Sequence, residues 1–327
     1  MAEDKGFARL KADLKAEQLQ NIYIFHGEET YLRTRYLQQV RQLLIPAGFE
    51  EFNDHRLNGK GLTVQTLSET VEAMPMMAQH TLVTVEDMDL FKLDEGQRSA
   101  LIGLMEDFPE YCTLIFVYDT LAYKRDGKMK KLCAALDAHA CVVEFAQQER
   151  QQLVNWLRRR FAALGHDIDP TTADHLLFTC GTLMTELVPE IEKIAAYAKH
   201  ERITVEDINA VADPILDARV FDMTNCITAG KYDDAARVLS ELLRMQTEPI
   251  VILAAVGKEL RRLYTARMAL DAGKDRLWLK QLWGMSSDYP AKLLMQAAKK
   301  VDHDWCSNAV IRCQRLDRRM KSERGMD

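Results

Sequence analysis

Residues 22 to 37, IYIFHGEETYLRTRYL, have the layout of a phosphate-binding loop, with an apolar run, a glycine and then a helical pattern. A working P-loop reads G-x-x-x-x-G-K-[ST]; its backbone N–H groups and lysine hold phosphates, and its hydroxyl binds Mg²⁺. Counted from Gly27, the last three motif positions are Leu32, Arg33 and Thr34. A bulky leucine blocks close approach, and a guanidinium does not replace the lysine ammonium. We therefore favour a degenerate loop that does not bind ATP over an unusual ATP site.

Carboxylates near this loop also argue against a nucleotide. Glu28 and Glu29 stand at the start of the helix, where a triphosphate would need unpaired N–H groups. Glu86 and Asp87 follow the apolar run TLVTV and could hold a metal ion, but acidic residues are common where strands end. We assign them no catalytic role.

The cysteines and histidines give no metal-binding pattern. The seven cysteines include no C-x-x-C pair, and the eight histidines include no H-E-x-x-H spacing. We therefore expect buried free thiols, no metal and no cofactor.

A methionine-rich segment, VEAMPMMAQH at residues 71–80, is a candidate for binding another protein. Pro75 disfavours continuing the preceding helix, so Met76 and Met77 should lie on a short loop, flanked by Met74. Two adjacent long apolar side chains do not both fit easily into one core, and methionine adapts well to partner grooves. The alternative is that these methionines only cover the local core.

Two basic stretches could contact phosphate groups of DNA, although charge runs on helices are usually solvated surfaces. No aromatic residues alternate with them to stack on bases. The stretches are Lys124, Arg125, Lys128, Lys130 and Lys131, and then Arg158, Arg159 and Arg160.

The elements that position these residues form an α/β arrangement in the first 145 residues. Apolar strand-like runs alternate with amphipathic segments, which predicts a parallel sheet of about five strands with helices on both faces, a three-layer αβα domain. The runs are NIYIFHG, FNDHRL, TLVTV, TLIFVYD and CVVEFA.

Beyond residue 146 the pattern is helical. Residues 146–212 predict a small bundle, with Asp169 and Pro170 as a helix start, and residues 213–327 predict longer helices punctuated by glycines. The wide apolar face of the segment 249–272 could be internal core or a subunit contact. With no signal-peptide or membrane-span pattern, we expect a cytoplasmic protein and no membrane contact.

The order of these features resembles the AAA+ clamp-loader subunits, and most closely the delta-subunit family of bacterial DNA polymerase III. The resemblance covers nearly the whole chain. It implies an AAA+-like α/β domain at 1–145, a helical lid at 146–212 and a helical collar at 213–327. It is carried by IYIFHGEETYL, the methionine segment, YKRDGKMKKL, GTLMTELVPEIEKI, Gln246, ELRRLY and LDRRMKS.

The resemblance also implies a function without a catalytic site. A delta subunit belongs to a DNA-directed DNA polymerase complex, a nucleotidyltransferase, and binds and opens the sliding clamp (the beta subunit) in DNA replication. Met76 and Met77, with Met74 and Pro75, match the clamp-binding loop, where the family often has Leu-Phe. Residues 213–327 would join the ATPase subunits (gamma/tau) and delta-prime, and primer-template DNA would be reached through the complex.

Two other functions remain open from the sequence. One is a divergent AAA+ NTPase that uses Thr34, Glu86 and Asp87. The other is a scaffold similar to delta-prime, although a Ser-Arg-Cys motif is absent from the sequence.

Overall fold

The computed structural model describes residues 5–285 and 287–322. The chain divides into two units. The first holds the residues up to Gln147 together with Leu183–Thr185, and the second holds Gln148–Thr182 and the residues from Glu186 onward. The predicted division into three domains, whose outer ends lie outside the described residues, stays a prediction.

The first unit is built on a five-stranded sheet in which each neighbouring pair is parallel, in the order β2-β3-β4-β1-β5. The predicted fold class is confirmed. The two strands with the longest apolar runs, β3 and β4, lie inside the sheet and are buried almost throughout. The strands are β1 (Ile22–His26), β2 (Asp54–Asn58), β3 (Thr81–Glu86), β4 (Cys112–Val117) and β5 (Ala140–Glu144).

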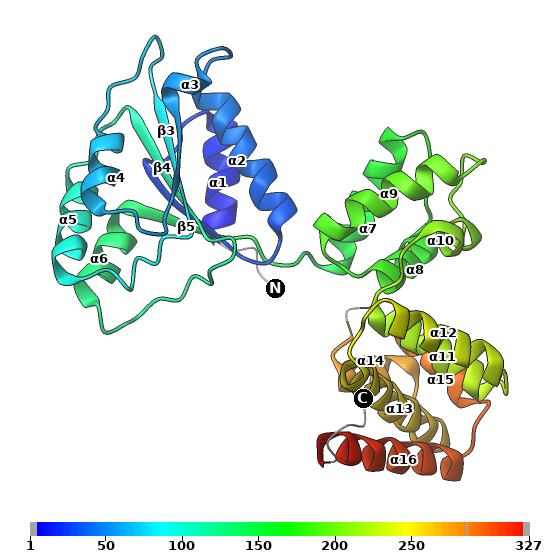
Figure 1. Ribbon diagram of the computed structural model, residues 1–327. Coiled ribbons are helices and arrows are strands. Elements are labelled where there is room, and N and C mark those ends of the chain that lie inside the picture. Colours follow the sequence, from blue (N-terminus) through cyan, green and yellow to red (C-terminus); the bar gives the residue numbers. More distant parts are fainter. Residues whose placement is uncertain (1–4, 286, 323–327) are drawn as a thin grey trace. The chain divides into compact units, whose positions relative to one another are not determined.

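Helices cover both faces of this sheet (Figure 1). On one face lie α1 (Lys5–Ala16) and α2 (Thr30–Leu44), and on the other lie α4 (Val64–Val71), α5 (Glu95–Glu106) and α6 (Lys130–His139). A short helix, α3 (Glu50–Asn53), precedes β2, so the predicted strand FNDHRL is shorter than expected and begins at Asp54.

The core of the first unit follows the two-residue period of the strands. Ile24, Val83 and Phe116 pack with the helices of one face, among them Leu67, Leu101 and Leu136. On the other face the Phe25 ring meets Phe145, with centroids 5.1 Å apart. Helix starts are set locally, since Thr63 caps α4 and Asp94 caps α5 through side-chain oxygens.

The second unit is helical, apart from one isolated bridge between Asp167 and Arg202. The predicted helix start at Asp169 is confirmed, because its carboxylate accepts hydrogen bonds from the N–H groups of Thr171 and Thr172. Pro170 is the first residue of the helix. Pro189 lies inside α9. The helices are α7 (Arg150–Ala163), α8 (Pro170–Cys180), α9 (Met184–Tyr197), α10 (Val205–Val211), α11 (Leu216–Thr228), α12 (Tyr232–Arg244), α13 (Pro249–Asp271), α14 (Arg276–Trp283), α15 (Tyr289–Ala298) and α16 (His303–Ser322).

Helix α13 packs against α11, α14, α15 and α16. The residues of its predicted apolar face, Ile250, Val251, Leu253, Ala254 and Val256, are half-buried or exposed, whereas Ile252 is buried. None of the helices in the described ranges combines the length and apolar character that a membrane span needs.

Candidate functional site

The glycine turn after β1 packs against the backbone of Phe145, the residue that follows β5. Gly27 has φ of 119°, and a Cβ atom there would lie 2.4 Å from the carbonyl oxygen of Phe145. The N–H of Glu29 donates to the same carbonyl at 2.9 Å. The glycine is therefore needed for a close approach of two backbone segments.

Leu32, Arg33 and Thr34 do not gather around an anion site, because α2 already begins at Thr30. Leu32 is buried, and Thr34 is exposed on the helix surface. Arg33 is 3% exposed; its Nη1 donates to the Gly27 carbonyl at 2.9 Å, and its Nη2 forms an ion pair with Asp119. The guanidinium thus joins the turn to the end of β4.

Protein groups occupy the N-terminus of α2, where a phosphate would otherwise bind. The Tyr31 N–H donates to the Thr185 hydroxyl at 3.1 Å, and that hydroxyl lies 2.6 Å from the hydroxyl of Thr30. Glu29 is fully buried, and its carboxylate accepts a bond from the Met184 N–H at 3.1 Å. Met184 and Thr185, which make these bonds, lie in the segment Leu183–Thr185 that belongs to the first unit.

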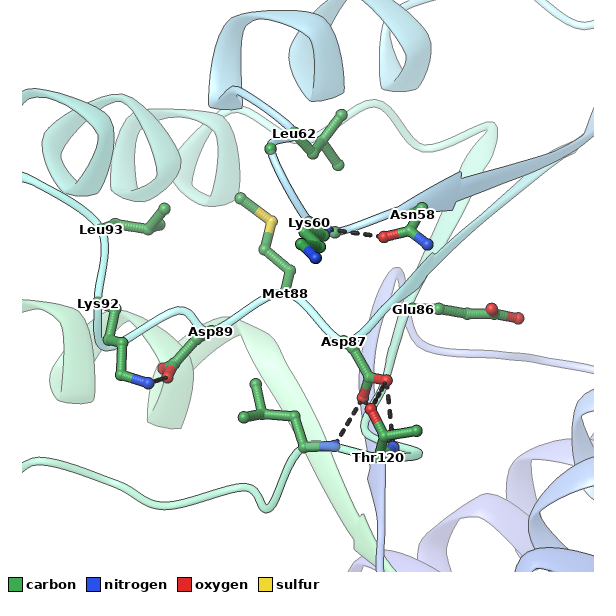
Figure 2. A pocket seen from close by; sticks show the side chains of 13 residues that line it. Asn58, Lys60, Leu62, Glu86, Asp87, Met88, Asp89, Lys92, Leu93 and Thr120 are labelled. Carbon is green, nitrogen blue, oxygen red and sulfur yellow. Dashed lines mark hydrogen bonds and ion pairs between the residues drawn. The ribbon is translucent and has the colours of Figure 1, made fainter.

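The carboxylate of Asp87 holds the loop after β4 (Figure 2). It accepts from the N–H groups of Asp119 at 2.8 Å and Leu121 at 3.0 Å, and from the Thr120 hydroxyl at 2.6 Å. Burial acts to raise the pKa of this carboxyl, but the hydrogen bonds from Thr120, Leu121 and Asp119 outweigh it and lower the pKa. Asp87 itself has φ of 56°, a strained backbone for a residue with a side chain.

A cavity of about 530 Å³ opens beside Asp87, between the ends of β2 and β3 (Figure 2). Exposed Glu86 lines it together with Lys60 and Lys92, two residues that the sequence did not single out. Lys92 pairs with Asp89 at 3.0 Å. Within the described residues, no three His, Cys, Asp or Glu side chains are arranged to hold a metal ion.

The methionine loop, defined as Met74–Met77, joins α4 to β3 and lies at the edge where β3 begins. Because the strands are parallel, this edge is opposite the one that carries Gly27 and Asp87. Met74, Met76 and Met77 are 79%, 56% and 83% exposed, so they do not cover the local core.

Hydrogen bonds from two side chains, one of them the buried Asn53, hold the backbone of this loop. The Asn53 side chain, which is fully buried, accepts from the Met76 N–H at 2.8 Å and donates to the Met76 carbonyl at 3.0 Å. It also donates to the Phe49 carbonyl at 3.0 Å. The Tyr111 hydroxyl donates to the Glu72 carbonyl at 2.8 Å, at the start of the loop. The backbone is fixed while the methionine side chains project into solvent.

The exposed apolar side chains of the first unit are concentrated at this place. Among its described residues, the large apolar side chains that are exposed are Phe52, Met74, Met76 and Met77. Phe52 is adjacent in sequence to Asn53, which contacts the loop directly. Sequence reasoning missed both residues because it assigned FNDHRL to a strand.

The basic residues after β4 are all exposed, but they are not equivalent. Arg125 forms a bidentate pair with Asp137, with Nη1–Oδ1 at 2.7 Å and Nη2–Oδ2 at 3.0 Å. This leaves the exposed side chains of Lys124, Lys128, Lys130 and Lys131 as the stronger candidates for phosphate contact.

The second basic stretch lies on α7, in the second unit. Arg158 and Arg159 are exposed and line a shallow cavity of about 570 Å³ with Asp167. The guanidinium of Arg160 lies over the Trp156 ring at 5.9 Å. This stretch therefore offers two exposed guanidinium groups rather than three.

Comparisons with known proteins place these features in one family. A model described as "DNA polymerase III, delta subunit" matches residues 23–146, and one described as "DNA polymerase III delta subunit, C-terminal domain" matches residues 217–327. The DNA polymerase III subunit delta of Bacillus subtilis is 22% identical over 94% of this chain and 90% of its own length. That of Escherichia coli is 22% identical over 77% of this chain and 72% of its own.

The fold has a solved counterpart. The structure of the DNA clamp loader delta protein of Bacillus subtilis matches with a TM-score of 0.50 at 20% identity, over 98% of this chain and 95% of that one. At this identity the match supports the fold alone.

Proposed function

Because the chain belongs to the family of DNA polymerase III delta subunits, we propose that it is the clamp-loader subunit that binds the sliding clamp and opens it during DNA replication. Met76 and Met77 enter an apolar pocket of the clamp, and the subunit itself hydrolyses no ATP. The observation that carries this proposal is the exposure of three methionine side chains on a loop whose backbone is hydrogen-bonded to the buried Asn53 side chain.

The physical basis for binding is apolar burial on a fixed backbone. Covering a methionine side chain contributes about 1.5–3 kcal/mol. Because the N–H and the carbonyl of Met76 are both already hydrogen-bonded to Asn53, little further ordering of the backbone is needed when a partner binds. The flexible thioether side chains can fit a pocket that a Leu-Phe pair also fits.

The occupied N-terminus of α2 supports the absence of ATP hydrolysis. Glu29, Thr185 and Arg33 make hydrogen bonds with other protein groups at the positions where phosphates would bind. Asp87 is engaged by the loop after β4 and has little capacity left for Mg²⁺. ATP-driven steps then fall to other subunits of the complex.

The second unit supplies the remaining partners in this proposal. The collar, residues 213–327, joins the ATPase subunits (gamma/tau) and delta-prime in the cytoplasm, and residues 146–212 form the lid. On α12, Tyr232, Leu239 and Leu243 follow one helical face and are exposed, as a subunit contact requires. The exposed lysines after β4, Lys124, Lys128, Lys130 and Lys131, contact primer-template DNA in the assembled complex.

Clamp binding is tested by surface plasmon resonance with the cognate sliding clamp. We expect Met76→Ala/Met77→Ala to weaken binding by about 30-fold or more, as for truncation of two interface anchors. The matched control is Met245→Ala/Met268→Ala, which removes methionines that are 60% and 51% exposed in the second unit. Unchanged affinity of the loop variant would refute the binding site.

Clamp opening and ATP use need separate measurements. A pair of fluorophores placed on either side of a subunit interface of the sliding clamp should move apart when this chain binds in the absence of ATP. Calorimetry with Mg-ATP should show no binding and phosphate release should stay at the buffer rate, with an ATPase subunit as positive control. Hydrolysis by the purified chain would favour a divergent NTPase.

A further inference from the structure

We propose that Asn53 is the positioning residue of the methionine loop, whose buried amide fixes Met76 so that the loop is presented to its partner in one conformation. This inference rests on the proposed role of the loop in clamp binding. It adds Asn53, a residue on a different element, α3; the Asn53 side chain is buried and acts on the partner only through the loop.

The geometry of the amide is specific. Its oxygen accepts from the Met76 N–H at 2.8 Å, while its nitrogen donates to the carbonyls of Met76 at 3.0 Å and Phe49 at 3.0 Å. One side chain therefore satisfies both backbone groups of a residue 23 positions away, as a neighbouring strand would. Asn53 is fully buried, so water does not easily replace these bonds if the side chain is removed.

The loop has few other means of holding this conformation. Met74 and Met77 are mostly exposed and contribute little packing of their own. Met77 has φ of 53°, in the left-handed region that side chains disfavour, so the surrounding contacts must maintain it. The bond from Tyr111 anchors Glu72, ahead of the methionines. Asn53 is the side chain that acts at the centre of the loop.

The donor pattern also makes a discriminating substitution available. In Asn53→Asp the side chain keeps its shape but presents a carboxylate oxygen to two backbone carbonyls, which repel it. Asn53→Ala removes all three bonds. Because Asn53→Asp keeps the volume of the side chain, a loss of clamp binding in this variant does not come from an unfilled space.

The test combines clamp affinity with a double-mutant cycle on the full chain. We expect Asn53→Ala and Asn53→Asp to weaken binding of the cognate sliding clamp by about tenfold. The same substitutions should have no further effect in the Met76→Ala/Met77→Ala background. The matched control is Asn21→Ala, because the Asn21 amide also donates to a loop carbonyl at this edge, that of Pro109 at 3.2 Å. It should bind the clamp like wild type.

Three outcomes overturn the inference in distinguishable ways. Wild-type affinity of Asn53→Ala, with weakened Met76→Ala/Met77→Ala, removes the positioning role and leaves the proposed function standing. Equal losses in both backgrounds show that Asn53 acts elsewhere. No effect of the methionine substitutions removes the proposed function and this inference together.

Hydrogen exchange of the wild-type chain keeps the test decisive if an Asn53 variant does not fold. The Met76 amide, bonded to a buried side chain, should be protected relative to an unstructured peptide. Exchange at the unprotected rate would overturn the inference without any variant.

Discussion

At the scale of single residues, the charged and polar groups around the turn after β1 are hydrogen-bonded to other groups of the protein. Arg33 donates to the Gly27 carbonyl, and Glu29 accepts from the Met184 N–H. The Thr185 hydroxyl accepts from the Tyr31 N–H at the N-terminus of α2. Buried groups of this kind stabilise the fold only while each keeps its partner. Substitutions that complete the P-loop motif should therefore not produce ATP binding.

We predict that Leu32→Gly/Arg33→Lys, which completes the motif from Gly27, gains no ATP binding. The helix already begins at Thr30, so the new glycine lies inside α2 rather than in a loop. The free energy of unfolding should fall by more than about 2 kcal/mol, because a buried leucine and the bonds of Arg33 are lost. Calorimetry with Mg-ATP and urea denaturation measure the two effects. Micromolar ATP binding would contradict the prediction.

A second residue-scale prediction concerns Glu259 on α13. Burial raises the pKa of this carboxyl to about 7 from 4.5, against the attraction of Arg262, which lowers it. Between these values the folded chain holds a proton that the unfolded chain has released, so stability should fall as the pH rises from about 4.5 to 7.

Glu259→Gln removes this dependence. It should raise the free energy of unfolding at pH 8 by about 1–3 kcal/mol and change it little at pH 4.5. Glu192→Gln, at an exposed position on α9, is the control and should be neutral at both pH values. Urea titrations at the two pH values check this, and equal effects of Glu259→Gln at both would argue against a raised pKa.

At the scale of elements, the short helix α3 is hydrogen-bonded to the methionine loop. Helix α3 carries Phe52, which is 49% exposed, next to Asn53, which bonds to the methionine loop. Separate elements can present a continuous apolar patch when a buried bond fixes one against the other. Phe52 is an exposed apolar side chain outside the loop that the sequence indicated.

We predict that Phe52→Ala weakens clamp binding by about 3–10-fold, less than the loss from the methionine pair, because Phe52 flanks the anchors. The fold should be retained, since the side chain is half exposed. Tyr232→Ala, at a residue that is 66% exposed on α12, is the control. Surface plasmon resonance compares the three chains, and wild-type affinity of Phe52→Ala would confine the binding surface to the loop.

At the scale of the whole molecule, the two units have separate cores and separate candidate surfaces. The first carries the methionine loop, and the second carries the exposed face of α12 with Leu239 and Leu243. Clamp binding and assembly with other subunits should therefore be separable by mutation.

We predict that Leu239→Glu/Leu243→Glu prevents assembly with the ATPase subunits and delta-prime while clamp affinity is unchanged. A pair of charges is costly in an apolar subunit contact but not on an exposed helix face. Arg244→Glu, on the same helix but outside the apolar face, is the control. Size-exclusion chromatography of the mixed subunits measures assembly, and an intact complex with the double variant would rule out this face.

The sequence by itself determined the features that depend on neighbouring residues. Apolar runs alternating with helical patterns predicted the parallel sheet, Asp169 and Pro170 predicted a helix start, and Pro75 predicted that Met76 and Met77 lie on a loop. These signals are local because strand and helix periods repeat within a few residues. The sequence also shows directly that Leu32 and Arg33 stand where a P-loop has its second glycine and its lysine.

Only the tertiary structure decided which distant groups meet. The bond from Asn53 to Met76 spans 23 positions, and that between Thr30 and Thr185 spans 155. Such pairs leave no periodic pattern, because they depend on strand order and on which backbone groups remain unpaired after the sheet forms. The sequence therefore located the methionine loop, whereas the fold showed what holds it and which groups occupy the N-terminus of α2.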